Sequence, residues 1–237
     1  MLSIKNITKT IKDKNIVNNI SFEVPSGFIN GLLGPNGAGK TSTFYMIAGL
    51  IKPDKGDIFL DNKNVSNYAM HKRSKMGIKY LPQEPSIFQN LSVYENLLGL
   101  AELSFKRKKE IENFIEKSIE EFNLSEIISH KGRQLSGGQR RKVEIARTLA
   151  ADPKIILLDE PFAGIDPIAI DEIKQVLLKL KNKNIGILIT DHNVREALEI
   201  CDDAIVINNG SIIAKGDKYS LIKNESVKKV YLGNMYS

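Results

Sequence analysis

The chain has 237 residues, of which 42% are apolar and 7% aromatic, and its formal net charge at pH 7 is +6. This composition is typical of a globular protein and excludes the intrinsically disordered class. The longest aliphatic runs, such as residues 155–158, have about four residues, far fewer than the ~20 that a membrane-spanning helix needs, so we predict no membrane span.

The excess of Lys and Arg (34) over Asp and Glu (28) is spread along the chain and forms no dense patch. We therefore expect no nucleic-acid partner, although a basic balance also suits a protein beside anionic lipid headgroups. The one cysteine, Cys201, excludes an internal disulfide and suits a reducing compartment. The first residues contain no apolar signal region, and we expect a cytoplasmic location.

Two alternating segments at 2–8 and 17–24 predict strands, and the polar turn 12–15 between them predicts a hairpin. An apolar run at 28–33 follows and has the character of a strand, while residues 41–50 have the character of a helix.

The sequence GPNGAGKT joins that strand to that helix and matches the pattern G-x-x-x-x-G-K-[ST]. Its glycines let backbone N–H groups surround phosphates, Lys40 can reach the β- and γ-oxygens, and the Thr41 hydroxyl can ligate Mg²⁺. A plain Gly-rich turn is the alternative for the motif alone, but the strand before it and the helix after it favour a nucleotide site. The expected nucleotide-binding residues here are Gly34, Pro35, Asn36, Gly37, Ala38, Gly39, Lys40, Thr41 and Ser42.

A strand at 57–60, a short helix at 68–75 and a strand at 77–81 follow. The sequence pattern then changes: residues 84–134 contain no convincing strand and are assigned to a helical subdomain. Ser92 and Glu95 have the spacing of a capping box, which predicts a helix to about residue 103. A second helix is predicted by an apolar face made of Ile111, Phe114, Ile115, Ile119 and Phe122.

Strands return at 155–158, 186–190 and 204–208, alternating with helical patterns, and this predicts a mostly parallel sheet covered by helices. A tight turn at 208–210 leads to a further strand. Apolar positions within 220–231 predict one short C-terminal helix.

Two more motifs indicate nucleotide chemistry: LSGGQ at 135–139 and IILLDE at 155–160. Ser136 and Gly137 open a predicted helix, so their N–H groups and the helix dipole can face a γ-phosphate. Asp159 ends a strand, where its carboxylate can reach Mg²⁺ at the edge of the sheet. Without the other motifs, both features would be interpreted as ordinary helix caps.

With these three motifs in this order, the chain resembles the ATP-binding subunits of ABC transporters over residues 2–231. The resemblance implies that Gln83, in YLPQE, touches Mg²⁺ and the attacking water, and that His192, in ITDHN, contacts the γ-phosphate. Asp166, in AGIDP, falls at the D-loop, where Pro167 makes an N-cap role equally consistent. Glu160 would polarise the attacking water as a general base.

The implied fold is α/β, a P-loop NTPase of ABC ATPase type, with a mostly parallel core sheet, an antiparallel β layer and an inserted helical subdomain. We expect a single ATP-binding domain over 1–237. Its RecA-like core would span about 1–83 and 135–216, its helical subdomain about 84–134, and its C-terminal helical segment about 217–237.

The resemblance also implies ATP and Mg²⁺ as cofactors, with Thr41, Gln83 and Asp159 as metal ligands. In this family the signature of one subunit covers the phosphates held by another, so we expect a homodimer. The covering residues would be Ser136, Gly137, Gly138 and Gln139. The position where the family usually stacks an aromatic ring on adenine is occupied by Ile11, which puts base discrimination in doubt.

Two narrower stretches, SIFQNLSVYENL and ITDHNVRE, resemble the ATPase subunits of lipopolysaccharide export transporters. That resemblance implies a peripheral position on the cytoplasmic face of the inner membrane, with two integral-membrane subunits docking behind the Q-loop. Phe88, Leu91 and Tyr94 would lie at the docking surface. The alternative for these three is ordinary core of the helical subdomain.

Three other functions stay open at this point. The ATPases of branched-chain amino acid importers resemble this sequence, although a C-terminal extension found on one of those subunits is missing. A soluble ABC ATPase acting on ribosomes or DNA usually has two cassettes or a long insertion, whereas 95 residues separate Lys40 from Leu135 here. A non-hydrolysing nucleotide switch is disfavoured by Glu160 and His192.

Overall fold

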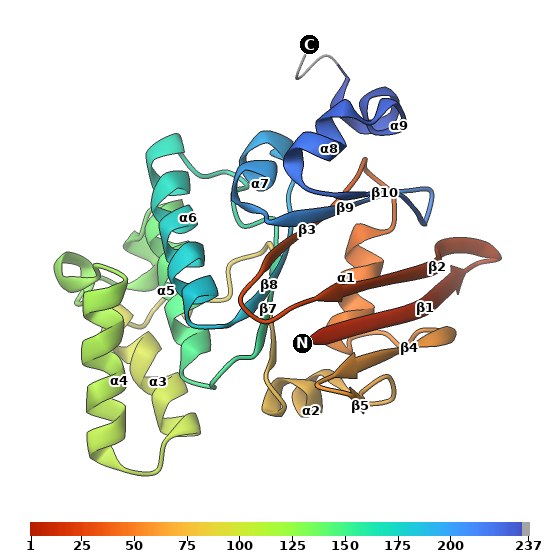
Figure 1. The fold of residues 1–237 in the computed structure, drawn as a ribbon. Coiled ribbons are helices and arrows are strands. Elements are labelled where there is room, and N and C mark those ends of the chain that lie inside the picture. The colour runs from red at the N-terminus through yellow and green to blue at the C-terminus, as the bar shows by residue number, and fades with distance from the viewer. Residues whose placement is uncertain (234–237) are drawn as a thin grey trace.

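The computed structural model describes residues 1–233, and two β-sheets form its framework (Figure 1). The smaller sheet is antiparallel with strand order β2-β1-β4-β5. Its strands are β1 (Leu2–Ile11), β2 (Lys14–Val24), β4 (Lys55–Leu60) and β5 (Lys63–Asn64). The predicted hairpin is confirmed, with longer strands than its sequence pattern indicated. The two-residue β5 was not predicted, because so short a segment has no periodicity to detect.

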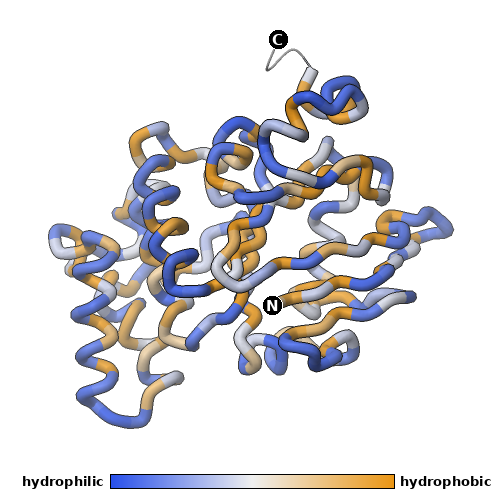
Figure 2. The backbone as a smooth tube through the Cα atoms, viewed as in Figure 1, coloured by the Kyte–Doolittle hydropathy of each residue, from blue (hydrophilic) through white to orange (hydrophobic). Residues whose placement is uncertain are grey.

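The larger sheet has strand order β10-β9-β3-β8-β7-β6, in which all neighbours are parallel except β10 and β9. Every residue of β3, β7 and β8 is buried, as expected for parallel strands covered on both faces. The hydrophobic colour in Figure 2 runs along these central strands. The six strands are β3 (Ile29–Leu33), β6 (Ile78–Leu81), β7 (Ile155–Asp159), β8 (Gly186–Thr190), β9 (Asp203–Asn208) and β10 (Ser211–Gly216).

Helix α1 (Lys40–Ala48) contacts β6 and β7 of the larger sheet and β2 of the smaller one. Its side chains Phe44, Met46 and Ile47 are fully buried and belong to the core that the two sheets share. The other helices of the parallel core are α2 (Met70–Lys75), α5 (Gly137–Leu149), α6 (Pro167–Asn182) and α7 (Val194–Ile200). The predicted α/β architecture, a mostly parallel core sheet with an antiparallel layer beside it, is thus confirmed.

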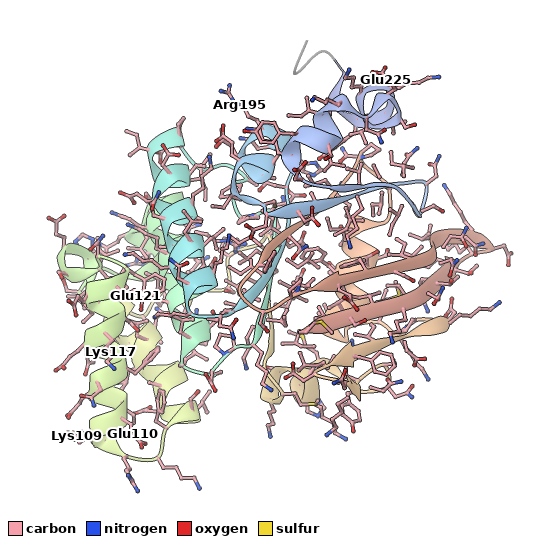
Figure 3. The ribbon with its side chains drawn as sticks, viewed as in Figure 1. Lys109, Glu110, Lys117, Glu121, Arg195 and Glu225 are labelled. Atoms are coloured by element: carbon pink, nitrogen blue, oxygen red, sulfur yellow. The ribbon has the colours of Figure 1, made fainter. Side chains whose placement is uncertain are left out.

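The inserted helical region lies on the opposite side of the molecule from the antiparallel sheet (Figure 1). It contains α3 (Val93–Ser104) and α4 (Lys108–Glu121), followed by 3₁₀ turns at Ser125–Ile127 and Gly132–Gln134. The predicted capping box is present, since Ser92 Oγ accepts from Glu95 N at 3.1 Å and Glu95 accepts from Ser92 N at 2.6 Å. Figure 3 shows charged side chains of α4, among them Lys109, Glu110, Lys117 and Glu121, on the outer face of this region.

The C-terminal segment differs from its prediction. The single helix expected over 220–231 is instead three short pieces: α8 (Lys218–Lys223), α9 (Glu225–Val227) and a π-helical turn, Lys228–Leu232. Asn224 explains the break, because it ends α8 in an extended conformation and its side chain caps the next piece by accepting from Val227 N. Residues 234–237 of the expected C-terminal segment lie outside the described residues.

Among residues 1–233, no helix combines the length and apolar character that crossing a membrane requires.

Candidate active site

The phosphate loop, residues 34–39, connects β3 to α1 at the carboxyl edge of the parallel sheet. Gly39 precedes α1 with φ = 105°, a left-handed conformation that favours glycine. A Cβ at this position would lie 2.5 Å from Ile16 O of the neighbouring hairpin. The loop can therefore approach the antiparallel sheet this closely only because position 39 carries no side chain.

Lys40 begins α1 and is 7% exposed. Its ammonium donates to Gly34 O at 2.8 Å and to Pro35 O at 3.0 Å, so it is held by the carbonyls of its own loop. Burial lowers the pKa of Lys40, while the nearby carboxylates of Glu160 and Asp159 act in the opposite direction. The Lys40 ammonium is thus held between the carbonyls of the phosphate loop and the charges of Glu160 and Asp159.

Asp159 is the last residue of β7 and is buried. The Tyr80 hydroxyl donates to its Oδ2 at 2.9 Å. Burial raises the pKa of Asp159, against the opposing effects of the Tyr80 hydrogen bond and the charges of Arg141 and Lys40. Carboxylate oxygens of this kind are the ligands that Mg²⁺ prefers in proteins.

Glu160 is the point where three of the predicted site residues meet. Gln83 Nε2 donates to Glu160 Oε2 at 2.7 Å, and His192 Nε2 lies 2.7 Å from Glu160 Oε1. The Glu160 backbone has φ = 47°, and its N–H donates to Thr190 O at 2.8 Å. Three distant segments, following β6, β7 and β8, thus converge on one carboxylate.

The pKa of Glu160 is raised chiefly by burial, with a further contribution from the carboxylates of Asp159 and Asp191, and the His192 charge opposes the rise. A carboxylate with a raised pKa that accepts from a glutamine and lies beside an imidazole is well suited to take a proton from water.

The signature residues 135–139 lie at the start of α5. Ser136 Oγ accepts from Gln139 N at 3.2 Å, and Gln139 Oε1 accepts from Ser136 N at 3.0 Å, which completes a capping box. A Cβ at Gly138 would lie 2.4 Å from Ala169 Cβ, so α5 and α6 approach closely at this glycine. Gly137 has more room, since its nearest neighbour would be 3.5 Å away.

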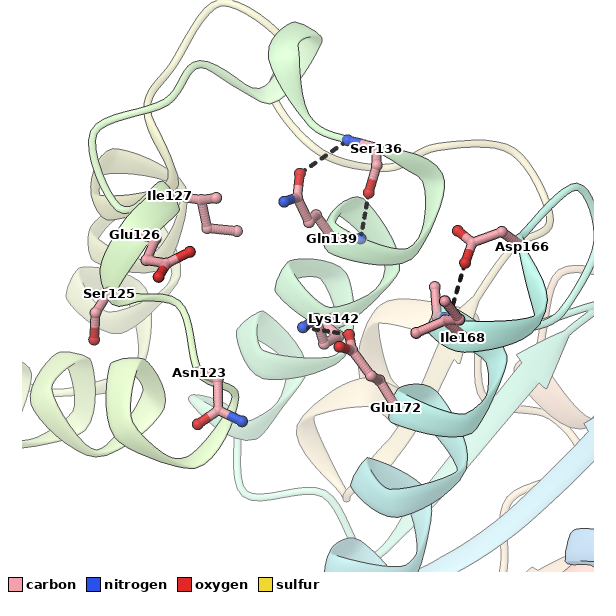
Figure 4. A pocket seen from close by; sticks show the side chains of 11 residues that line it. Asn123, Ser125, Glu126, Ile127, Ser136, Gln139, Lys142, Asp166, Ile168 and Glu172 are labelled. Atoms are coloured by element: carbon pink, nitrogen blue, oxygen red, sulfur yellow. Dashed lines mark hydrogen bonds and ion pairs between the residues drawn. The ribbon is translucent and has the colours of Figure 1, made fainter.

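A cavity of about 540 Å³ adjoins this signature (Figure 4). Ser136 and Gln139 line one side of it, and Asp166 lines another from the start of α6. Asp166 Oδ1 accepts from Ala169 N at 3.0 Å, so this aspartate caps α6 as its Asp-Pro sequence allowed. The remaining lining residues are Asn123, Ser125, Glu126, Ile127, Lys142, Ile168, Ala169 and Glu172.

Ile11 is the last residue of β1, pairs with Lys14 in the hairpin, and is 45% exposed. Thr41 and Ser42 lie in the first turn of α1, directly after Lys40.

The three candidate docking residues are exposed: Phe88 by 53%, Leu91 by 39% and Tyr94 by 44%. The alternative interpretation, that they form the core of the helical region, is therefore wrong. The Phe88 ring lies under the guanidinium of Arg147, 4.9 Å from ring centroid to Cζ. Its backbone is fixed by the buried amide of Asn96, which accepts from Phe88 N at 2.9 Å and donates to Phe88 O at 3.0 Å.

A chain of buried polar contacts joins this surface to the acidic residues. Arg147 donates to Ser86 O at 3.0 Å, and Glu144 accepts from Ser86 N at 2.6 Å. Glu144 pairs with Arg141 at 3.2 Å, and Arg141 donates to Asp159 O at 3.2 Å. Sequence reasoning missed this chain, because a run of Arg and Glu on one helix has the same pattern as a solvated surface.

Asp191 was also missed. Its carboxylate is buried directly before His192 and accepts backbone N–H groups on two sides. The only signal in the sequence is an acidic residue at the end of an apolar strand, the same signal that identified Asp159.

Comparison with known proteins gives a consistent result. The sequence profile described as "ABC transporter" matches residues 17–163. The chain is 49% identical to the lipopolysaccharide export system ATP-binding protein LptB of Haemophilus influenzae, over 100% of this chain and 98% of that protein. Identity to the protein of the same name from Escherichia coli K12 is 48%, covering 98% and 97%, and to that from Acidithiobacillus ferridurans 44%, covering 100% and 98%.

Solved structures agree with the fold. An ATP-binding cassette of an ABC transporter in its ADP conformation superposes with a TM-score of 0.87 at 31% identity, covering 98% of each chain. A nucleotide-free ATP-binding cassette has the same TM-score at 32% identity, covering 98% of this chain and 99% of that one.

Proposed function

This chain belongs to the ABC transporter family of ATP-binding subunits, and we propose that it is the ATPase that powers lipopolysaccharide export. The observation that carries the proposal is identity of 44–49% over essentially the whole chain to lipopolysaccharide export ATP-binding proteins of three genera. The branched-chain amino acid importer and the ribosome- or DNA-directed ATPase are not favoured by these relatives.

We propose that ATP binds at residues 34–42, with Lys40 and the loop N–H groups on its phosphates. The residues present fit a Mg²⁺ ion, because Asp159 is a buried carboxylate at the end of β7 and Thr41 adds a hydroxyl in the first turn of α1. Gln83 would complete the protein ligands. When bound, the ion would neutralise phosphate charge during transfer.

Hydrolysis then depends on Glu160. Its carboxylate would accept a proton from the attacking water, and burial favours this by raising its pKa. Gln83 and His192, each 2.7 Å from one of its oxygens, fix the carboxylate in place and would orient the water and the γ-phosphate. The convergence of the three side chains supports these roles.

We further propose that two copies act together. The chain has one phosphate loop and one signature. Ser136 N and Gln139 N are used within the capping box, so the start of α5 would offer the N–H groups of Gly137 and Gly138 next to an open cavity. The signature of one subunit would cover ATP held by the other, and the D-loop residue Asp166 would lie in the interface between them.

The chain would attach to the membrane by binding partner proteins. Phe88, Leu91 and Tyr94 form an exposed apolar surface, and we propose that two integral-membrane subunits dock their helices there on the cytoplasmic face of the inner membrane. Polar contacts from Phe88 through Arg147 and Arg141 to Asp159 offer a physical link between docking and hydrolysis.

The proposal is tested by replacing the native gene with Glu160→Gln under a depletable wild-type copy. After depletion, newly made lipopolysaccharide should stay in the inner-membrane fraction on density separation. The wild-type chain purified in mild detergent should bring down two integral-membrane proteins. Normal lipopolysaccharide transport in the depleted strain would refute the proposed substrate while leaving the ATPase assignment intact.

A further inference from the structure

Asp191 is the most deeply placed carboxylate at the active edge of the sheet that the proposed hydrolysis does not use. It follows β8, lies between Thr190 and His192, and is 1% exposed. Its two oxygens have different partners: Oδ2 accepts from Phe162 N at 2.8 Å, and Oδ1 accepts from Asn193 N at 2.7 Å.

These two partners belong to the two segments that carry the hydrolytic pair. Phe162 comes two residues after Glu160, and Asn193 comes directly after His192 and caps α7. The carboxylate therefore connects the Glu160 loop to the His192 loop, next to the point where His192 Nε2 meets Glu160 Oε1 at 2.7 Å. A second tie, Glu160 N to Thr190 O at 2.8 Å, fixes the same loops on the other side of Asp191.

The charges around Asp191 explain how a buried acid is tolerated. Burial raises its pKa, whereas its two backbone hydrogen bonds and the charges of His192 and Arg141 act against the rise. The Glu160 carboxylate is also close to Asp191, since the Asp191 charge contributes to the raised pKa of Glu160. Hydrogen bonds to an ionised acceptor are roughly twice as strong as neutral ones, so this acid holds the two loops more firmly than an amide would.

We propose that Asp191 is a positioning residue for ATP hydrolysis, clamping the His192 loop to the Glu160 loop so that imidazole and carboxylate meet. The inference rests on the proposed catalytic role of Glu160 and does not depend on which substrate is exported. An asparagine at position 191 can accept only one of the two N–H bonds, because its NH₂ group would face the other donor. One side of the clamp is then lost with almost no change in volume.

The test compares the purified Asp191→Asn variant with the purified wild-type chain. We expect kcat for ATP hydrolysis to fall by roughly tenfold to a hundredfold, as displacements of about 1 Å near reacting groups do, while KM for ATP changes by less than about twofold. Asp191→Ala loses both bonds and should lower kcat further. If Asp191→Ala fails to fold, Asp191→Asn alone still decides the question.

A spectroscopic readout separates positioning from a general structural role. The chain has three histidines, so long-range ¹H–¹⁵N spectra of the imidazoles can be assigned by single substitutions. In Asp191→Asn, the His192 resonances should move toward those seen in Glu160→Gln, where the partner carboxylate is absent. The resonances of His71 and His130 should not move.

Asp202→Asn is the matched control. Asp202 also accepts a neighbouring strand's N–H, that of Ile29 at 2.9 Å, and pairs with Lys181. It lies where β3 and β9 begin, at the opposite edge of the sheet from the phosphate loop. Its substitution should lower the melting temperature without changing kcat or the His192 resonances. Unchanged kcat in Asp191→Asn, or a His192 signal identical to wild type, would overturn the proposal.

Discussion

Replacing Phe88 with alanine separates membrane coupling from catalysis. About half of this side chain is exposed and its ring stacks with the Arg147 guanidinium. Fully burying a phenylalanine contributes about 1.5–3 kcal/mol, so the half-buried ring accounts for about 1 kcal/mol. The cation–π contact adds about 0.5 kcal/mol at an exposed site. For a chain of this size, a loss of about 1.5 kcal/mol lowers the melting temperature by about 3–6 °C.

A core phenylalanine would behave differently. Truncating it would cost about 3–5 kcal/mol, and the middle of that range corresponds to a fall of about 8–16 °C. We therefore expect the isolated Phe88→Ala subunit to keep its ATPase rate and most of its thermal stability. In detergent pull-downs it should recover much less of the membrane subunits, because Phe88 would be an apolar anchor of the proposed docking surface, and such anchors carry a large share of the binding energy.

Leu103→Ala is the matched control, since Leu103 is 84% exposed at the far end of α3. It should melt, hydrolyse ATP and assemble as the wild type does. A Phe88→Ala protein that melts as a core truncation would contradicts the exposed role of this side chain. A stable Phe88→Ala protein that assembles and supports lipopolysaccharide export normally contradicts its docking role.

Four further outcomes are expected. Lys40→Ala should lose ATP binding, whereas Glu160→Gln should bind ATP, stall hydrolysis and elute as an ATP-dependent dimer on size exclusion; a monomeric mutant at saturating ATP contradicts this. Burial raises the pKa of Glu160, so kcat should fall on acidification with a midpoint above that of an ordinary glutamate, and a midpoint at the ordinary value would exclude this base. Ile11→Tyr should tighten a fluorescent ATP analogue by up to roughly tenfold, since base stacking contributes about 1–3 kcal/mol; equal affinities would show that Ile11 is not over the base. Gly138→Ala should destabilise the folded chain by about 1–3 kcal/mol in thermal melts, because the new Cβ would lie 2.4 Å from the Cβ of Ala169. Gly99→Ala is the control: it has open space inside α3 and should stabilise the folded chain by about 0.5–1 kcal/mol.

The sequence was informative wherever a local pattern has a local cause. The glycine spacing of the phosphate loop, the Ser92 capping box and the apolar strand before Asp159 each depend on residues a few positions apart, and each was found. The prediction of one helix over 220–231 was wrong, because it relied on apolar spacing alone. That spacing is helical, but the side chain of Asn224 caps a second helix inside the segment.

Partners brought together by the fold could not be predicted from pattern alone. Tyr80 bonds to Asp159 across 79 residues of sequence, and Phe162 bonds to Asp191 across 29. Nothing local distinguishes Tyr80 or Phe162 from ordinary strand or loop positions. The roles of Gln83 and His192 came from resemblance, and the structure adds what resemblance could not give, the distances at which they contact Glu160.

The buried charges of α5 are better explained by communication than by stability. Arg141 and Glu144 have side chains only 6% and 3% exposed, and a buried ion pair often contributes no more than an apolar pair of the same volume. Within residues 1–233, Nε of Arg141 and Nε of Arg147 also find no hydrogen-bond partner, which adds a desolvation cost. What these side chains provide is geometry: they connect Phe88 at the surface to the backbone of Asp159 through directional bonds that an apolar core would lack. A docked helix that moves the Ser86 backbone, which Arg147 and Glu144 hold, would thereby act on the segment that holds Glu160.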